Sequence, residues 1–301
     1  MAASLRGGRA EAQRVIGPGL GPVRRYSAAT HDPDRSPFSP GYDSDVDLPR
    51  VLVTNDDGAA AEGIQRLAEC LGDVAEPWII APDTDRSGSS HALTMSTPLR
   101  WRAWDRGPAG RTFGVSGTPG DCVYFGLSHL LNDRSPALVV AGINRGYNLA
   151  DDVTYSGTVA AAMESVLLGV PAIAISAESF REDCLTVSCL IARRLVELCL
   201  ASPELLPSGT FLNVNVPHGA EPQDLSITSL GRRAYSRQVL FGTDPRGKPY
   251  FWVGGDPQAH EVTAGTDCVE TLDRRRVSIT PMQVDLTAAK LLATWSSRLN
   301  P

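Results

Sequence analysis

The segment that most constrains the fold is a short apolar run that stops at two adjacent acidic residues. Residues 51–54 read VLVT, and they are followed directly by Asn55, Asp56, Asp57 and Gly58. An apolar run of this length is typical of a buried parallel strand. In open α/β sheets, ligands bind at the carboxyl ends of such strands. The run therefore predicts that Asp56 and Asp57 lie at a ligand-binding edge of a sheet, although the same residues could form a simple turn.

The segments after this run alternate between helical and strand patterns. Apolar residues at Ile64, Leu67, Ala68 and Leu71 have the spacing of one helix face, which predicts a helix over 60–71. Further strands are predicted at 78–81, 137–141, 172–176, 211–216 and 277–280, and further helices at 122–131, 159–168, 183–200 and 285–299. Because β-α-β crossovers are right-handed and short, this alternation predicts an α/β fold with a mostly parallel sheet flanked by helices.

The composition of the chain excludes some kinds of binding partner. The chain has 301 residues, of which 42% are hydrophobic, and a net charge of -6. This length is sufficient for one large core, so we expect one domain over 49–301. An acidic chain lacks the basic surface that nucleic acid polymers require, and no apolar run is long enough to cross a membrane. The six cysteines are scattered without a paired motif, as expected for free thiols in a reducing compartment.

Two segments of the chain, residues 1–48 and 217–275, differ from this pattern. Residues 1–48 are rich in Gly, Pro, Ser and Arg, and we expect a disordered extension there. The run Arg24-Arg25-Tyr26-Ser27 resembles the processing site of an organellar transit peptide, but the extension lacks an apolar helix face, and we expect a cytoplasmic protein. Residues 217–275 contain short extended pieces between Gly, Pro and Arg residues, which predicts an antiparallel arm of the kind that joins subunits.

Polar residues follow several of the predicted strands. The loop over 82–91 contains Ser87 together with acidic residues, an arginine and His91, while Asn144 lies between glycines after the strand at 137–141. A third segment, Ser156, Gly157 and Thr158, opens a predicted helix, where free N–H groups favour a phosphate. Each segment could instead be a solvated loop or a helix cap, and nothing in the sequence fixes the direction of His91 as a general acid. The oxygen donors together favour Mg²⁺, Mn²⁺ or Ca²⁺ over Zn²⁺ or copper, beside a phosphate.

These motifs, taken in order, resemble the SurE family of divalent-metal-dependent nucleotidases. The resemblance rests on VLVTNDDG, APDTDRSGSSHALT, the Gly-Thr-Pro-x-Asp-Cys-Val motif at 117–123 and AGINRGYNLADDVTYSGTVAAAMES, and it covers about residues 50–298. It implies a Rossmann-like fold with an extended hairpin arm, a homodimer or homotetramer, and hydrolysis of nucleoside 5′-monophosphates and often 3′-monophosphates. The sequence departs from the family at 59–62 and at Tyr147, where we expect an effect only on substrate preference.

The resemblance also implies roles for individual residues. The family's metal ligands correspond to Asp56, Asp57, Ser87 and Asn144, with Asp56 and Asp57 as the catalytic carboxylates and one Mg²⁺ or Mn²⁺ ion per subunit. Its phosphate-contacting segment corresponds to Ser156, Gly157 and Thr158. The nucleophile could be a water molecule or Asp56 itself. A nucleotide-binding sensor without hydrolysis is the alternative function. A haloacid dehalogenase is disfavoured because its two aspartates lie two positions apart, and the glycine-rich turn of a Rossmann dehydrogenase is missing.

Overall fold

A computed structural model describes residues 48–104, 107–108, 111–236, 238–255 and 257–299. The predicted extension over 1–48 lies outside the described residues except for Leu48. In the described part of the chain, no helix combines the length and the hydropathy of a membrane span. All six cysteines lie in the described part and are free thiols, as the sequence predicts.

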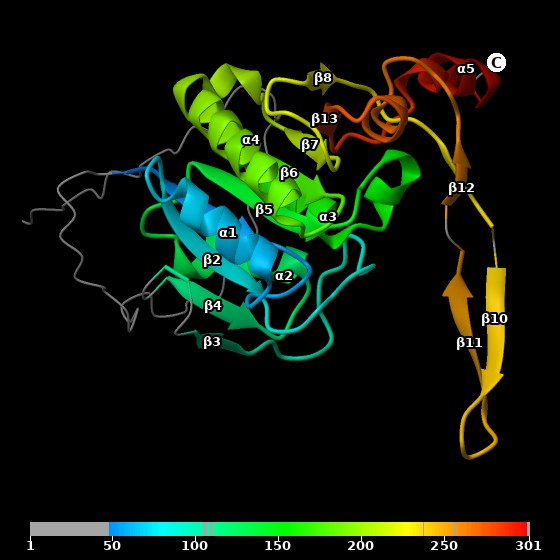
Figure 1. The fold of residues 1–301 in the computed structure, drawn as a ribbon, viewed down its shortest axis with the longest axis horizontal. Helices are drawn as coiled ribbons and strands as arrows, with labels where there is room; N and C mark the ends of the chain where they lie inside the picture. Colours follow the sequence, from blue (N-terminus) through cyan, green and yellow to red (C-terminus); the bar gives the residue numbers. More distant parts are fainter. Residues whose placement is uncertain (1–47, 105–106, 109–110, 237, 256, 300–301) are drawn as a thin grey trace, which may run out of the picture. The chain divides into compact units, whose positions relative to one another are not determined.

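A nine-stranded sheet organises the described residues (Figure 1). Its strands are β1 (Arg50–Thr54), β2 (Glu76–Pro82), β3 (Trp101–Ala103), β4 (Thr112–Val115), β5 (Leu138–Arg145), β6 (Ala172–Ala177), β7 (Thr210–Val216), β8 (Leu225–Ile227) and β13 (Val277–Gln283). They follow the order β3-β4-β2-β1-β5-β6-β7-β13-β8, and the neighbours from β4 to β7 are all parallel. β1 therefore has β2 on one side and β5 on the other. The strand order reverses at β1, which makes its carboxyl end the topological switch point of the sheet. The predicted mostly parallel α/β fold is confirmed.

Helices cover both faces of the sheet. α1 (Glu62–Leu71) and α4 (Glu182–Ala201) pack together over one face, while α2 (Pro119–Phe125) and α3 (Gly157–Leu167) pack together over the other (Figure 1). The alternation of β1 divides its side chains between the two layers, with Val51 and Val53 in the α1–α4 core and Leu52 in the α2–α3 core. This burial on both faces explains why the run is apolar throughout.

Shorter elements complete the chain. Two 3-10 turns, Ala150–Thr154 and Pro203–Leu205, and two π-helical turns, Gly126–Leu130 and Val269–Asp273, lie between the main elements, and α5 (Ala289–Leu299) closes the described chain. α5 begins later than predicted. α2 is a capped helix in which Thr118 and Asp121 form a capping box, and the chain continues from it into the π-helical turn, within the helix predicted over 122–131.

Two antiparallel hairpins lie within the predicted arm. β10 (Gln238–Thr243) pairs with β11 (Pro249–Gly254), and β9 (Arg233–Tyr235) pairs with β12 (Pro257–His260). The β10–β11 pair forms its own two-stranded sheet (Figure 1). Its exposed apolar side chains include those of Phe241, Phe251 and Trp252. β8 differs from the expectation of an arm strand, because it joins the main sheet parallel to β13.

The sequence analysis missed β4. This strand has only four residues, TFGV, and its central Gly114 is typical of a turn rather than of a strand. The structure explains the glycine, because an added Cβ would lie 2.3 Å from Nε1 of Trp104. The close contact with Trp104 therefore requires glycine at position 114, and no sequence pattern predicts such a contact.

Candidate active site

A tight turn after β1 presents the two acidic residues. The side chain of Asn55 is buried and bridges the turn: its Nδ2 donates to the carbonyl of Gly58 at 3.0 Å, and its Oδ1 accepts from the Gly58 N–H at 3.1 Å. Gly58 has a φ of 103°, which a residue with a side chain rarely adopts. Asn55 and Gly58 thus fix the turn, and this leaves Asp56 and Asp57 to face the loops at the sheet edge.

Asp56 is held by the first turn of α3. It is only 4% exposed, and its Oδ1 accepts a hydrogen bond of 2.5 Å from the hydroxyl of Thr158. Burial raises the pKa of Asp56, the charge of Asp85 raises it further, and hydrogen bonds from Thr158 oppose both effects. Ser156 caps the same helix by accepting a hydrogen bond from the N–H of Val159 at 3.1 Å. The helix end and the strand end are therefore joined directly.

Gly157 allows α3 to approach Asp56 closely. An added Cβ would lie 2.8 Å from the Cβ of Asp56 and 2.9 Å from Oγ of Ser89, distances that require a rearrangement. The hydroxyl of Ser89 is buried and has no hydrogen-bond partner in the part of the chain that the structure describes. A buried hydroxyl without a partner is costly, so it is a candidate contact for a bound group.

Asp57 lies beside the carboxyl end of β5. Its Oδ2 accepts a hydrogen bond of 3.3 Å from the backbone N–H of Arg145. Burial, followed by the charges of Asp56 and Asp85, raises the pKa of Asp57 to about 6. The neighbouring Asn144 is 9% exposed, and its Nδ2 donates to the carbonyl of Gly146 at 2.8 Å. Because this bond occupies Nδ2 of Asn144, Oδ1 of the same side chain is the atom that could bind a cation.

Ser87 lies in the loop after β2 and contacts an acidic residue that the sequence analysis did not select. Both its N–H and its hydroxyl donate to Oδ1 of Asp85, each at 2.7 Å. The preceding N–H, that of Arg86, donates to the carbonyl of Asp56 at 2.8 Å and so attaches this loop to the end of β1. Asp85 could have been found from its place in a loop that leaves the same edge of the sheet.

A buried amide network fixes the loop after β5, which begins directly after Asn144 and Arg145. The N–H of Asn148 donates to Oδ1 of Asn215 at 2.8 Å, and its carbonyl accepts from Nδ2 of Asn215 at 3.1 Å and of Asn213 at 2.8 Å. Nδ2 of Asn148 donates to the hydroxyl of Ser176 at 2.8 Å. The partners lie on β6 and β7, and this network therefore ties the loop after β5 to two further strands. The sequence predicts both strands but not this network.

His91 does not pair with the acidic turn. Its Nε2 lies 2.7 Å from Oε2 of Glu164, a buried residue about two turns into α3. This contact gives His91 a structural partner on α3 and accounts for its direction, which the sequence left open.

The donor set fits a hard divalent cation. Burial raises the pKa of Asp56 and Asp57, the charge of Asp85 raises both further, and Asp56 also raises that of Asp57, so positive charge placed beside these carboxylates would relieve their repulsion. The other polar groups at this edge are the unpartnered hydroxyl of Ser89, the hydroxyl of Ser87 and the amide oxygen of Asn144. All of these donors are oxygens, which suits Mg²⁺ or Mn²⁺. Asp56, Asp57, Ser87 and Asn144, the ligands that the family resemblance implies, each offer an oxygen that could hold such an ion, and this role stays a prediction.

Comparisons with known proteins show the family of this chain. The model of the family described as "Survival protein SurE" matches residues 51–237. The 5′-nucleotidase SurE of Nitrosococcus oceani is 47% identical over 255 residues, which cover 83% of this chain and 98% of the relative. The corresponding protein of Myxococcus xanthus is 46% identical over 238 residues, which cover 79% and 88%. The crystal structure of the Aquifex aeolicus SurE protein is similar with a TM-score of 0.71 at 35% identity, covering 84% of this chain and 100% of that one. This chain belongs to the SurE family.

Proposed function

We propose that this protein is a divalent-metal-dependent phosphomonoesterase that hydrolyses nucleoside 5′-monophosphates, and 3′-monophosphates as a second class, to nucleoside and phosphate. The observation that carries the proposal is the direct bond between Thr158, in the first turn of α3, and Asp56, at the end of β1. It puts a helix amino end, which favours phosphate, beside buried carboxylates that favour a cation. The relatives named 5′-nucleotidase SurE support the same activity and the same substrate class.

Each group at the site has a role in this proposal. Asp56, Asp57, Ser87 and Asn144 would hold one Mg²⁺ or Mn²⁺ ion, and Asp56 and Asp57 are the catalytic carboxylates. A bound ion of this kind neutralises charge on the phosphoryl oxygens and favours attack at phosphorus. Ser156, Gly157 and Thr158 would contact the phosphate, and the bond from Thr158 to Asp56 would keep it in register with the carboxylates.

We propose further that the protein acts in the cytoplasm as a homodimer or homotetramer. Six free thiols support a reducing compartment. The β10–β11 hairpin supports assembly, because it exposes large apolar side chains, including those of Phe241, Phe251 and Trp252, in a sheet of its own. Size-exclusion chromatography with light scattering, on the full chain and on a Trp252→Ser variant, tests this part. A wild type that is monomeric at micromolar concentration would contradict it.

Phosphate release from nucleoside 5′- and 3′-monophosphates tests the activity. The assay compares Mn²⁺, Mg²⁺ and EDTA for the wild type and for Asp56→Asn. We expect release only with the metal, and a loss of at least about a hundredfold in the variant, because removing a central charge-stabilising group typically costs on the order of 3 kcal/mol or more. Asp73→Asn is the matched control, since Asp73 pairs with Arg193 on the exposed side of α4 and its replacement should leave the rate unchanged.

The same assay separates hydrolysis from sensing. A wild type that binds nucleotide in the presence of Mn²⁺ but releases no phosphate would favour the sensor and would contradict the proposal. Metal-dependent release that survives intact in Asp56→Asn would contradict the site but not the activity.

A further inference from the structure

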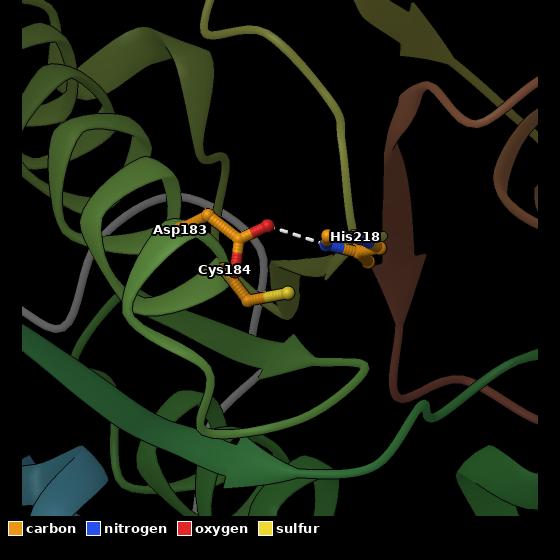
Figure 2. Close-up of side chains that lie close together, drawn as sticks. All are labelled: Asp183, Cys184 and His218. Carbon is orange, nitrogen blue, oxygen red and sulfur yellow. Dashed lines mark ion pairs between the residues drawn. The ribbon is translucent and has the colours of Figure 1, made fainter.

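Three side chains with different donor atoms converge at a second place on the molecule. Asp183 and Cys184 lie in the first turn of α4, and His218 follows β7 by two residues. Figure 2 shows the three side chains directed toward one another from these two segments. Each offers one ligand atom, and these atoms lie within 4.8 Å of one another. The three residues, called the Asp183–Cys184–His218 cluster below, take no part in the proposed nucleotidase site.

We propose that this cluster is a zinc site, with a carboxylate oxygen of Asp183, Sγ of Cys184 and Nδ1 of His218 as protein ligands and water in the fourth position. Zinc binds such donors at about 2.0 to 2.3 Å in a tetrahedron, so its ligand atoms lie about 3.5 Å apart. The ligand atoms of the cluster lie within 4.8 Å of one another, so small side-chain movements can bring them to this spacing. The mixed sulfur, nitrogen and oxygen donors select zinc over Mg²⁺, in contrast to the all-oxygen set around Asp56.

Asp183 and His218 must separate slightly to admit the ion. Their carboxylate and imidazole now pair directly with each other. Both side chains can move, since those of Asp183 and His218 are 43% and 46% exposed. Cys184 is only 1% exposed, so its sulfur forms the floor of the site beneath two adjustable ligands that solvent reaches. Zinc binding displaces the proton of the Cys184 thiol to solvent and leaves the thiolate bound to the metal.

The backbone that carries His218 is held in place independently of any metal. Its N–H donates to Oε2 of Glu178 at 2.7 Å, and its carbonyl accepts from Nη2 of Arg275 at 2.9 Å. Glu178 also pairs with Arg275 and accepts a 2.7 Å hydrogen bond from the hydroxyl of Tyr147. The backbone position of His218 is therefore set before the ion arrives, and only its side chain must adjust, which lowers the entropy that binding must overcome. Tyr147 lies in the loop after β5, close in sequence to Asn144, and zinc would thus stabilise the neighbourhood of the proposed active site.

Cobalt is the probe for the donor set. Co²⁺ replaces Zn²⁺ in tetrahedral sites, and a cobalt–thiolate bond gives a near-ultraviolet charge-transfer band that an all-oxygen site cannot give. We expect one equivalent of Co²⁺ to produce this band in the metal-free full chain, and Zn²⁺ to abolish it. The band should vanish in Cys184→Ser and persist in Cys199→Ser, which removes another buried thiol of α4. A wild type without the band, or a band that persists in a folded Cys184→Ser, overturns the proposal.

A second variant tests the zinc site without a substitution at the buried Cys184. His218→Gln changes a half-exposed side chain and should fold normally. We expect its zinc affinity, measured by competition with a chromophoric chelator, to fall at least about tenfold, the smallest loss typical of a disturbed metal site. Zinc should raise the melting temperature of the wild type and not of this variant. Equal zinc affinity in the two proteins overturns the proposal. Because the readouts are metal binding and thermal unfolding, they stand whether or not the nucleotidase assay succeeds.

Discussion

The hydroxyl of Thr158 donates a 2.5 Å hydrogen bond to Oδ1 of Asp56, and so joins the first turn of α3 to the end of β1 across 102 positions of sequence. This bond links the proposed phosphate-binding segment to the proposed metal-binding carboxylates. A substitution of Thr158 or of Asp56 should therefore affect both phosphate binding and metal binding.

Thr158→Val tests this link, because valine keeps the shape of threonine and removes the hydroxyl donor. Loss of a hydrogen bond to a buried carboxylate costs about 1 to 3 kcal/mol. We expect phosphatase activity at saturating nucleotide to fall at least about tenfold, and more Mn²⁺ to be needed for half-maximal rate. Thr158→Ser should retain most of both, since serine restores the donor. Equal activity of the valine and serine variants would contradict the link.

Gly157→Ala should also impair the site, although it adds only one methyl group. The new Cβ would lie 2.8 Å from the Cβ of Asp56 and 2.9 Å from Oγ of Ser89, and α3 must move away to admit it. We expect a loss of activity of at least about tenfold, since small displacements of reacting groups are costly. Gly254→Ala, where an added Cβ meets nothing within 4 Å, is the control and should match the wild type. Kinetics with nucleoside monophosphate over a range of Mn²⁺ concentrations would decide the outcome.

Asn215→Ala should reveal the role of the buried amide network. The variant leaves the buried N–H of Asn148 without its acceptor, a penalty of about 1 to 3 kcal/mol in the free energy of unfolding. Since the network holds the loop that directly follows Asn144 and Arg145 at the end of β5, activity should fall as well. Urea unfolding and metal-dependent kinetics measure the two effects. Asn132→Ala changes an exposed asparagine outside the network and should alter neither, and a neutral Asn215→Ala would contradict the anchoring role.

The contacts of Glu178 with His218, Tyr147 and Arg275 predict that the free energy of unfolding depends on pH. Burial raises the pKa of Glu178, but hydrogen bonds from the His218 N–H, Tyr147 and Arg275 outweigh it and hold the pKa below its ordinary value of 4.5. A carboxyl with a lowered pKa in the folded state stabilises the protein above its unfolded pKa and loses this contribution as the pH falls through the folded value.

Glu178→Gln should therefore destabilise the protein most near neutral pH. Below a pH of about 4.5 the difference in unfolding free energy between wild type and variant should shrink. Urea unfolding at a series of pH values measures this difference. Glu204→Gln, at an exposed glutamate of the turn Pro203–Leu205, should show no such trend. A difference for Glu178→Gln that grows as the pH falls would contradict the assignment.

The sequence was most informative where one periodicity dominated. The uninterrupted apolar run of β1 follows from burial on both faces, and the amphipathic spacing in α1 predicted the β1-α1-β2 unit whose parallel pairing the structure confirms. The placement of Asp56, Asp57 and Asn144 at one edge follows from that topology alone. Their metal-binding role stays a prediction.

The sequence was least informative where contacts between distant loops decide the outcome. Ser89 and Asp85 lie in a polar loop without periodicity, and only the close approach of Gly157 and the turn around Ser87 show their relation to the site. The same holds for Cys184 and His218, which are 34 positions apart and meet because β6 and β7 are neighbours in the sheet. Such pairs have no local signature.

The central position of β1 in the sheet has a consequence for how the site could be divided. The chain up to residue 131 builds β1 and everything on the β2 side of it, and the chain from residue 137 builds β5, β6 and β7 on the other side. Asp56, Asp57 and Ser87 therefore come from one segment, while Asn144 and Thr158 come from the other. If the chain were cut in the exposed turn at 132–135, neither fragment would contain all the predicted site residues. Both fragments would be inactive, and activity would return only when they reassociate.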